Sequence, residues 1–553
     1  MVMPIVRLAL AQTNPTVGAI EANLAQALSE IRKAKEQGAD LVVFGEMAIT
    51  GYPIEDLASR ESFILEAELA VRRLSSQLSS PEFKGLAVVI GHPAMASAQE
   101  QTGWAIAKNC ATVIIDGQIV GRYAKHHLPN YSVFDEYRNF VPGNDLLTFE
   151  HKGLRFSTVI CEDIWQQGGP VAKLADQNTD VALILNGSPF EIDKDDKRLS
   201  LVKELVKRQN CAAAYVNLVG GQDDLVFDGD SIVVDSKGRL VARAKQFKSD
   251  LVLIDIEAKD ELKVVGEHHL TRPNDNWQAW NALVLGLRDY IQKNGFKSVV
   301  LGLSGGIDSA VCATIAADAI GAENVFGVSM PSRYSSDGSK DDAEDLASRR
   351  GINYRVQPIE EMVKPFETGL GLSGLSAENL QARVRGVILM GLSNKEGHLT
   401  LTTGNKSELA VGYSTIYGDT VGGYAPLKDV EKTLVWELAK WRNQYAVSRN
   451  EVEPIPVSSI EKAPSAELRP DQVDQDSLPP YDVLDAILDA YVNQRKSTAE
   501  IVAFGFNEEL VSKILTLVDR AEWKRRQGAI GPKITGMAFG RDRRLPITNK
   551  YKG

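Results

Sequence analysis

The stretch VVLGLSGGIDSAVCATIAADAIG, residues 299–321, constrains the fold more than any other part of the chain. An apolar strand runs directly into a glycine-rich loop and then into a helix, whose first N–H groups lack partners within the helix. The glycines let a backbone approach phosphate oxygens closely, and the hydroxyls of Ser304 and Ser309 can add donors. No Gly-Lys-Ser/Thr follows, so this is not a Walker loop. The pattern predicts a phosphate-binding site at a helix N-terminus.

The segments around this loop repeat the same strand and helix alternation. Apolar strands are predicted near residues 325–331, 354–359 and 399–404, with helices between them. Such alternation is typical of a doubly wound parallel sheet. The chain after about residue 477 reads as helical and then ends in a basic, glycine-bearing tail.

The first 260 or so residues form a second pattern of short strands rich in Val and Ile, separated by helical or loop segments. This pattern predicts a layered α/β sandwich. Near residue 260 it gives way to a polar stretch with a proline, which is typical of a linker. We therefore expect two α/β domains, 1–262 and 276–553, joined by a linker at 263–275.

Composition limits the partners and the compartment. Hydrophobic residues make up 44% and charged residues 24%, while 62 Lys and Arg against 73 Asp and Glu give a net charge of −11. We therefore expect no nucleic-acid and no membrane partner. No segment approaches the roughly 18 apolar residues of a membrane span, and the first residues lack the pattern of a signal peptide. Because CxxC spacing is also missing, we expect a reducing, cytoplasmic location. The four cysteines are Cys110, Cys161, Cys211 and Cys312.

Three polar residues of the first half make chemical sense together: Glu46, Lys125 and Cys161, each where a predicted strand ends. A thiol that attacks an amide needs a base for its proton and positive groups around the tetrahedral oxyanion. Glu46 can serve as the base and Lys125 can stabilise the oxyanion, while Cys161 forms a thioester. The pattern indicates an amide-hydrolysing site. A catalytic role for His126 or His127 is a weaker alternative.

The glycine-rich loop resembles the pyrophosphate loop of the N-type ATP pyrophosphatases, which transfer AMP to an acyl oxygen. Further motifs, ENLQARVR, TTGNKSELAVGY, PSAELRPDQVDQDSLPPYDVLD and FGRDRRLPI, are similar to those of the NAD synthetases across residues 276–553. The resemblance implies that the loop binds ATP together with Thr403 and Lys432. It also implies that Asp308 and Glu408 hold Mg²⁺, an assignment that suits a hard cation on phosphate oxygens. The loop residues are Gly302, Leu303, Ser304, Gly305, Gly306, Ile307, Asp308 and Ser309.

The same resemblance implies that deamido-NAD is bound by Asn379, Arg383, Glu408 and Lys524. One position departs from the pattern. Where the ammonia-using members carry a lysine eight residues after the metal glutamate, this chain has Ile416.

The motifs around Glu46, Lys125 and Cys161 resemble the carbon–nitrogen hydrolase, or nitrilase, superfamily across residues 4 to about 250, which implies an αββα sandwich. A nitrilase domain fused to an NAD synthetase domain resembles the glutamine-dependent NAD synthetases. This implies glutamine contacts from Tyr131, Ser188 and Lys194, amidation of deamido-NAD with ammonia from glutamine, and a homo-oligomer. Lys194 lies in EIDKDDKR, which reads as a charged loop, and Glu136 and Glu162 lie near the site without an assigned role.

Three other functions remain open at this point. A related pyrophosphatase could act on another acceptor, although the ENLQAR and TGNKSE motifs argue against it. The chain could be an amidase whose second domain only senses ATP. It could also be a noncatalytic interaction protein, which is disfavoured because both sets of reactive residues are present.

Overall fold

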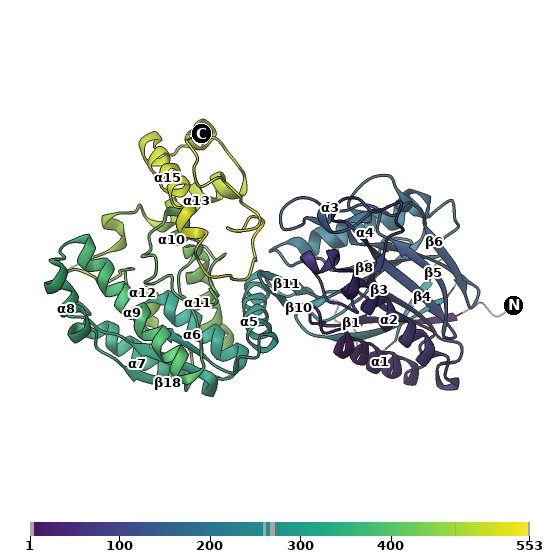
Figure 1. The fold of residues 1–553 in the computed structure, drawn as a ribbon, viewed down its shortest axis with the longest axis horizontal. Coiled ribbons are helices and arrows are strands. Elements are labelled where there is room, and N and C mark those ends of the chain that lie inside the picture. The colour runs from purple at the N-terminus through teal and green to yellow at the C-terminus, as the bar shows by residue number, and fades with distance from the viewer. Residues whose placement is uncertain (1–4, 258–260, 266–270, 471, 551–553) are drawn as a thin grey trace. The chain divides into compact units, whose positions relative to one another are not determined.

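The seven-stranded sheet near the N-terminus has the order β15-β14-β1-β2-β3-β4-β5 in the computed structural model, which describes residues 5–257, 261–265, 271–470 and 472–550 (Figure 1). The pairs of β1 with β2 and of β2 with β3 are parallel, and β14 and β4 are antiparallel to their neighbours. The strands are β1 (Ile5–Gln12), β2 (Leu41–Phe44), β3 (Ala87–Met95), β4 (Ala107–Ile115), β5 (Gln118–Ala124), β14 (Asp250–Glu257) and β15 (Glu261–Val265).

A six-stranded sheet of order β13-β12-β9-β8-β7-β6 packs against the first sheet. Its strands are β6 (Leu147–His151), β7 (Leu154–Ile160), β8 (Val181–Asn186), β9 (Ala212–Asn217), β12 (Ile232–Val234) and β13 (Leu240–Arg243). A separate pair joins β10 (Val219–Gln222) to β11 (Leu225–Asp228). The helices of this part are α1 (Ile20–Glu36), α2 (Glu61–Leu78), α3 (Glu136–Asn139) and α4 (Lys194–Gln209).

Alternation along β1 explains the layering of the two sheets and their helices. Leu8 and Leu10 lie in the apolar core that the two sheets share, whereas Ala9 and Ala11 lie in the core beneath α1 and α2. Successive side chains of a strand point to opposite faces, so a strand that is apolar throughout needs cover on both. With α4 packed on β9 and β12, the layers run helix, sheet, sheet, helix, which confirms the predicted αββα sandwich.

The second sheet system is fully parallel, with the order β18-β17-β16-β19. Because β16 has β17 on one side and β19 on the other, the chain reverses its winding direction at β16, and ligands bind at such a point. The helices α8 and α9 contribute to an apolar core with β16 and β17, and α6 also packs on these strands. The predicted doubly wound sheet is confirmed.

The elements of this second part have the following bounds. Its strands are β16 (Val299–Gly302), β17 (Val325–Ser329), β18 (Asn353–Val356) and β19 (Leu399–Thr400). Its helices are α5 (Asp275–Lys293), α6 (Ile307–Ile320), α7 (Asp337–Arg350), α8 (Glu360–Leu370), α9 (Leu375–Glu396), α10 (Lys406–Val411), α11 (Lys432–Ser448), α12 (Val457–Glu461), α13 (Tyr481–Leu488), α14 (Thr498–Ala503), α15 (Glu508–Arg520) and α16 (Glu522–Arg525).

The chain divides into two compact units, one of residues 1–222 and 226–274 and the other of 223–225 and 275–553. Of the predicted linker, residues 263–265 belong to β15, which pairs with β14, while 266–270 lie outside the described residues. The predicted domain boundaries otherwise stay a prediction. The expected charged loop at 191–198 is wrong, because α4 begins at Lys194.

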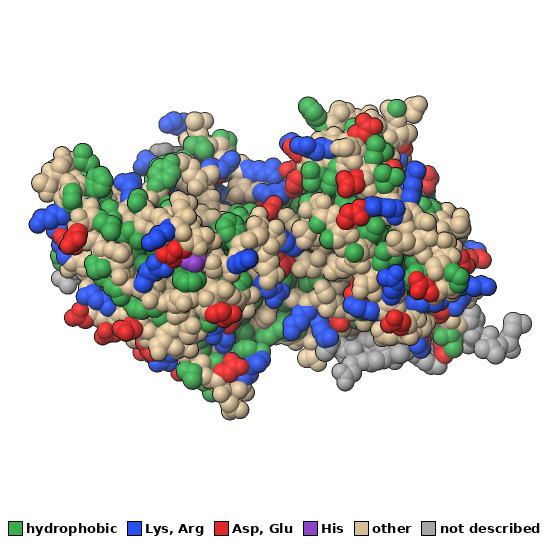
Figure 2. Space-filling view, turned by 60° about the horizontal axis from the view of Figure 1, so that its bottom comes forward, with side chains coloured by type: hydrophobic (Ala, Val, Ile, Leu, Met, Phe, Trp, Pro, Cys, Tyr) green, Lys and Arg blue, Asp and Glu red, His purple; other side chains and the backbone are tan. Residues whose placement is uncertain are grey.

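The surface mixes both signs of charge. On the face that Figure 2 shows, acidic and basic side chains lie interspersed among apolar and neutral ones. Across the part of the chain that the structure describes, no helix is long and apolar enough to cross a membrane.

Candidate functional site

Cys161 lies at a sharp turn directly after β7. It begins a short 3₁₀ helix, Cys161–Ile164, and has a φ of 40°, in the left-handed region that residues with a Cβ seldom adopt. The Asp163 carboxylate accepts a hydrogen bond from the N–H of Ile160, the last residue of β7, at 2.9 Å. The turn therefore fixes the thiol at the carboxyl end of β7, within the core that the two sheets share.

Asp163 also ties this turn to the segment that carries Lys125. Its carboxylate accepts hydrogen bonds from the Tyr123 hydroxyl at 2.6 Å and from the N–H groups of His126 and His127 at 3.1 and 2.8 Å. One buried side chain thus holds the end of β5 against the Cys161 turn. The two histidines contribute backbone N–H groups to this link.

Glu46, Lys125 and Glu136 form a buried cluster of charges. The Lys125 Nζ lies 2.9 Å from Glu46 Oε1 and 2.9 Å from each oxygen of Glu136, and only 1% of its side chain is exposed. Asn109 and the N–H of Gly187 donate to the two oxygens of Glu46, at 2.6 and 2.8 Å. These donors orient a carboxylate that has almost no contact with water.

Burial and the charges of this cluster together set the protonation of the thiol. Burial raises the pKa of Cys161 well above its ordinary value, Glu46 raises it further, and Lys125 opposes them. Burial alone would lower the pKa of Lys125, but Glu136 and Glu46 raise it. Burial raises the pKa of Glu136 to about 7, although Lys125 acts in the opposite direction. The arrangement therefore pairs a neutral thiol with a charged ammonium, so the thiol needs a base before it can attack.

The rate at which iodoacetamide alkylates Cys161 should depend on pH because of this protonation state. Below the pKa of a thiol, the reactive thiolate fraction grows about tenfold per pH unit. We expect the rate of labelling at Cys161, measured by peptide mass spectrometry, to rise in this way up to at least about pH 9. A plateau near neutral pH would contradict the raised pKa.

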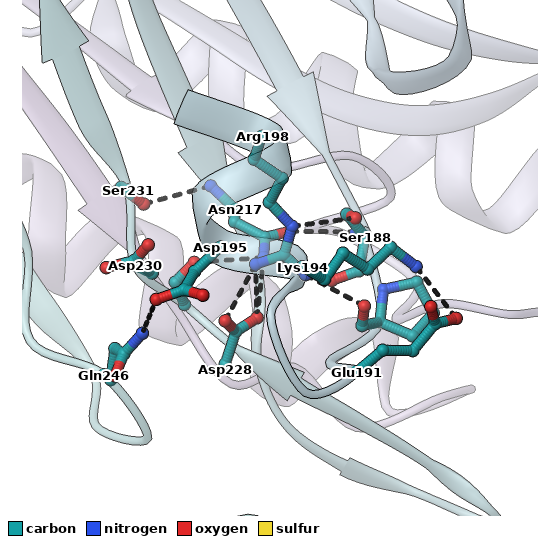
Figure 3. A network of polar contacts seen from close by, with 12 residues as sticks. Ser188, Glu191, Lys194, Asp195, Arg198, Asn217, Asp228, Asp230, Ser231 and Gln246 are labelled. Atoms are coloured by element: carbon teal, nitrogen blue, oxygen red, sulfur yellow. Dashed lines mark hydrogen bonds and ion pairs between the residues drawn. The ribbon is translucent and has the colours of Figure 1, made fainter. Parts of the chain in front are cut away.

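The three predicted glutamine contacts lie on different segments. Tyr131 is 54% exposed, and its hydroxyl donates to the buried Glu162 at 2.9 Å. Ser188 is buried in the turn after β8, and Lys194 is the first residue of α4, with its Nζ 3.2 Å from Glu191. Figure 3 shows Ser188 and Lys194 on neighbouring segments.

A cavity of about 310 Å³ lies in the second unit, around the turns after β16 and β19. Apart from Gly305, the whole predicted loop from Gly302 to Ser309 lines it, as do Thr403, Glu408 and Lys432. The loop folds on itself, because Ser309 Oγ donates to the Gly306 carbonyl and Ser304 Oγ accepts from the Gly306 N–H, at 2.9 and 3.2 Å. The predicted ATP residues therefore share one cavity at the N-terminus of α6.

Gly305→Ala should disrupt this loop. Gly305 has a φ of 77°, and a Cβ would lie 2.2 Å from the Ser339 carbonyl oxygen. We expect a fall of at least about 10-fold in any ATP-dependent activity and a loss of about 1–3 kcal/mol in the free energy of unfolding, measured by denaturant titration. Gly338→Ala is the matched control, because a Cβ there meets nothing within 4 Å. Equal effects of the two changes would refute the steric argument.

Asp308 and Glu408 face one ammonium group in this cavity. Lys432 Nζ lies 2.5 Å from Asp308 Oδ2 and 3.2 Å from Glu408 Oε1, and Asn405 donates to Asp308 Oδ1 at 2.9 Å. Burial raises the pKa of Glu408 to about 7, Lys432 acts to lower it, and Asp308 raises it further. Within the described residues no set of three or more His, Cys, Asp or Glu could hold a metal. Two carboxylates beside a phosphate loop nevertheless fit Mg²⁺, which takes its other ligands from phosphates and water.

The other predicted deamido-NAD residues converge on the segment 412–416. Lys524 Nζ donates to the carbonyls of Gly412 and Ser414, both at 2.8 Å, and Asn379 Oδ1 accepts from the Thr415 hydroxyl at 2.8 Å. The Nε of the exposed Arg383 donates to the Ile416 carbonyl at 3.3 Å. The isoleucine at position 416 does not remove this contact with Arg383, because the contact uses the backbone carbonyl of residue 416 and not its side chain.

Several residues of these sites were not predicted from the sequence. Asp163 could have been suspected as a carboxylate two residues after Cys161. Asn109 gives no local signal, because it lies within β4 and reaches Glu46 only through the fold. Asp474 lines the nucleotide cavity and accepts from the Tyr481 hydroxyl at 2.8 Å, yet it comes from a distant segment.

Comparisons with known proteins place each unit in a known family. The carbon–nitrogen hydrolase family model matches residues 7–261, and the NAD synthase model matches residues 279–528. A glutamine-dependent NAD(+) synthetase of Acinetobacter baylyi is 46% identical, with 99% of each chain covered, and one of Thermotoga maritima is 40% identical over 99% of each.

Two solved structures are similar along the whole chain. A glutamine-dependent NAD+ synthetase from Acinetobacter baumannii, described in complex with adenosine diphosphate, has a TM-score of 0.77 and 44% identity, covering 99% of both chains. One from Cytophaga hutchinsonii has a TM-score of 0.82 at 23% identity, covering 99% of this chain and 98% of the other. The latter likeness concerns the fold.

Proposed function

Because this chain belongs to the glutamine-dependent NAD(+) synthetases, we propose that its two sites divide one reaction between them. The sandwich hydrolyses glutamine at Cys161, and the nucleotide unit uses ATP and the released ammonia to convert deamido-NAD into NAD. The observation that carries this division is that Glu46 and Lys125 pair beside the Cys161 turn in one unit, while the predicted ATP residues line one cavity in the other.

At the first site, the Cys161 sulfur attacks the side-chain amide carbon of glutamine. Glu46 takes the thiol proton and returns it to the leaving nitrogen, so ammonia departs and a thioester remains. Lys125 stabilises the oxyanion. Water then attacks the thioester, with Glu46 again as base, and releases glutamate and the free thiol. Tyr131, Ser188 and Lys194 bind the end of glutamine that carries the α-amino and α-carboxylate groups.

At the second site, the nicotinate carboxylate of deamido-NAD attacks the α-phosphorus of ATP and pyrophosphate leaves. Ammonia then attacks the activated carbon and AMP departs, which leaves the amide of NAD. The loop from Gly302 to Ser309, with Thr403 and Lys432, holds the phosphates. Asn379, Arg383, Glu408 and Lys524 hold deamido-NAD. Mg²⁺ bound by Asp308 and Glu408 would supply positive charge against the phosphate oxygens.

The test measures all products together. The full chain is incubated with Mg²⁺, ATP, deamido-NAD and glutamine, and we expect NAD and AMP to appear one for one with glutamate present. Glutamate without NAD or AMP would replace the proposal with the ATP-sensing amidase. A homo-oligomer and a cytoplasmic location stay predictions.

A further inference from the structure

Every backbone polar group of Ser188 is bound by the surrounding fold. Its N–H donates to Asn217 Oδ1 at 2.9 Å. Its carbonyl accepts from Arg198 Nη2 at 3.0 Å and from Asn217 Nδ2 at 3.2 Å. Asn217 and Arg198 therefore hold the turn after β8 in place (Figure 3).

Arg198 uses each of its five N–H donors in this network. Nη1 bonds both oxygens of Asp228 at 2.8 Å, Nη2 bonds the carbonyls of Ser188 and Pro189 at 3.0 and 2.9 Å, and Nε bonds Ser188 Oγ at 3.2 Å. The side chain is 1% exposed, as is expected only for a guanidinium with a full set of partners. Asp228 balances its charge.

The direction of the bond at Ser188 Oγ has a chemical consequence. A guanidinium can only donate, so the serine oxygen must accept from Nε, and the hydroxyl keeps its own proton to donate elsewhere. A carboxylate can only accept. With Nε fixed as the donor, the Ser188 hydroxyl can direct its proton to an acceptor such as the α-carboxylate of an amino acid.

Arg198 also connects Ser188 with Lys194, the cation that we propose pairs with the same carboxylate. It lies four residues after Lys194 on α4, so both lie on the same face of the helix. Its bonds to Ser188 and Pro189 hold the turn after β8 against the first turn of that helix. The spacing between the Ser188 hydroxyl and the Lys194 ammonium therefore depends on Arg198.

We propose that Arg198 is a positioning residue that confers specificity for the α-carboxylate of glutamine, acting through the Ser188 hydroxyl and the first turn of α4. The inference rests on the proposed glutamine site. In this proposal Arg198 does not contact the substrate, because its guanidinium already bonds to Asp228 and to the Ser188 turn.

The test compares glutamine with 4-aminobutanamide, which is glutamine without its α-carboxylate. Arg198→Lys keeps the charge for Asp228 but loses the fork that reaches Ser188. We expect kcat/KM for glutamine to fall at least about 10-fold, mainly through KM, while kcat/KM for 4-aminobutanamide changes less than about threefold. NAD formation from ammonium should stay within about twofold, since it does not use this site.

Matched variants separate positioning from folding. Arg239→Lys is the control, because Arg239 pairs with Asp235 in the same unit but is 66% exposed. In the double variant with Ser188→Ala, the added change at Arg198 should cost less than Arg198→Lys costs alone, since part of its effect passes through the Ser188 hydroxyl. Asp228→Asn, which keeps the side-chain shape, should reproduce the selective loss if Arg198→Lys does not fold.

Two outcomes would overturn the inference: equal losses of kcat/KM on both amides, or no loss on glutamine. Glutamine hydrolysis by the unaltered chain is measured before any variant is compared. If there is none, the proposed function itself fails.

Discussion

Cys161→Ala should abolish NAD formation from glutamine, with a loss of at least about 10³-fold, because no other group in the site can form the thioester. NAD formation from ammonium should stay within about twofold, since the substitution leaves the nucleotide cavity in the other unit untouched. Both rates are measured with saturating ATP and deamido-NAD, by separating NAD and AMP chromatographically.

Cys211→Ala is the matched control for this change. Cys211 is also buried in the same unit but lies directly before β9, and none of the charged groups Glu46, Lys125 and Glu136 acts on the pKa of its thiol. The Cys211→Ala enzyme should lose some stability but still make NAD from glutamine. A Cys161→Ala enzyme that still makes NAD from glutamine would show that the thiol is not the nucleophile.

Asp308→Asn should reduce NAD and AMP formation at least about 100-fold with either nitrogen source, because both depend on ATP cleavage. Asparagine keeps the shape and one acceptor for the Asn405 amide but removes the charge that faces Lys432. A neutral amide is also a poor ligand for a hard cation. The Mg²⁺ concentration needed for half-maximal rate should therefore rise, as measured by titration at fixed ATP.

Asp345→Asn controls for the loss of one acidic side chain in the same unit. Asp345 pairs with Arg349 on α7 and is half-exposed, so its replacement should leave AMP formation unchanged within about twofold. An Asp308→Asn enzyme with the original rate and Mg²⁺ requirement would remove Asp308 from the metal site.

Sequence patterns predicted the elements whose signal is local. The strand, loop and helix of residues 299–321 carry their geometry in consecutive residues, because glycine spacing and a helix N-terminus suffice to define the loop. The layering of the sandwich followed in the same way, since strands apolar on both faces require cover on both. Glu46, Lys125 and Glu136 then meet in the structure as one cluster.

Contacts that depend on long-range packing were not predictable in this way. In EIDKDDKR, Arg198 looks like one solvated charge among many, and only its partners Asp228 and Ser188, on other segments, reveal a buried group. The gathering of Asn379, Arg383 and Lys524 on residues 412–416 likewise results from three separate helices or loops meeting. No spacing in the chain encodes such a meeting.

The left-handed backbone at Cys161 means that the nucleophile sits on a strained main chain. A side chain with a Cβ costs about 1 kcal/mol or more in that conformation, whereas glycine adopts it freely. Cys161→Gly would remove this backbone penalty but would also lose a buried side chain and add freedom to the unfolded chain, whereas Cys161→Ala would keep the penalty. The enzyme therefore carries a backbone penalty at its nucleophile, a position where the chemistry demands a side chain.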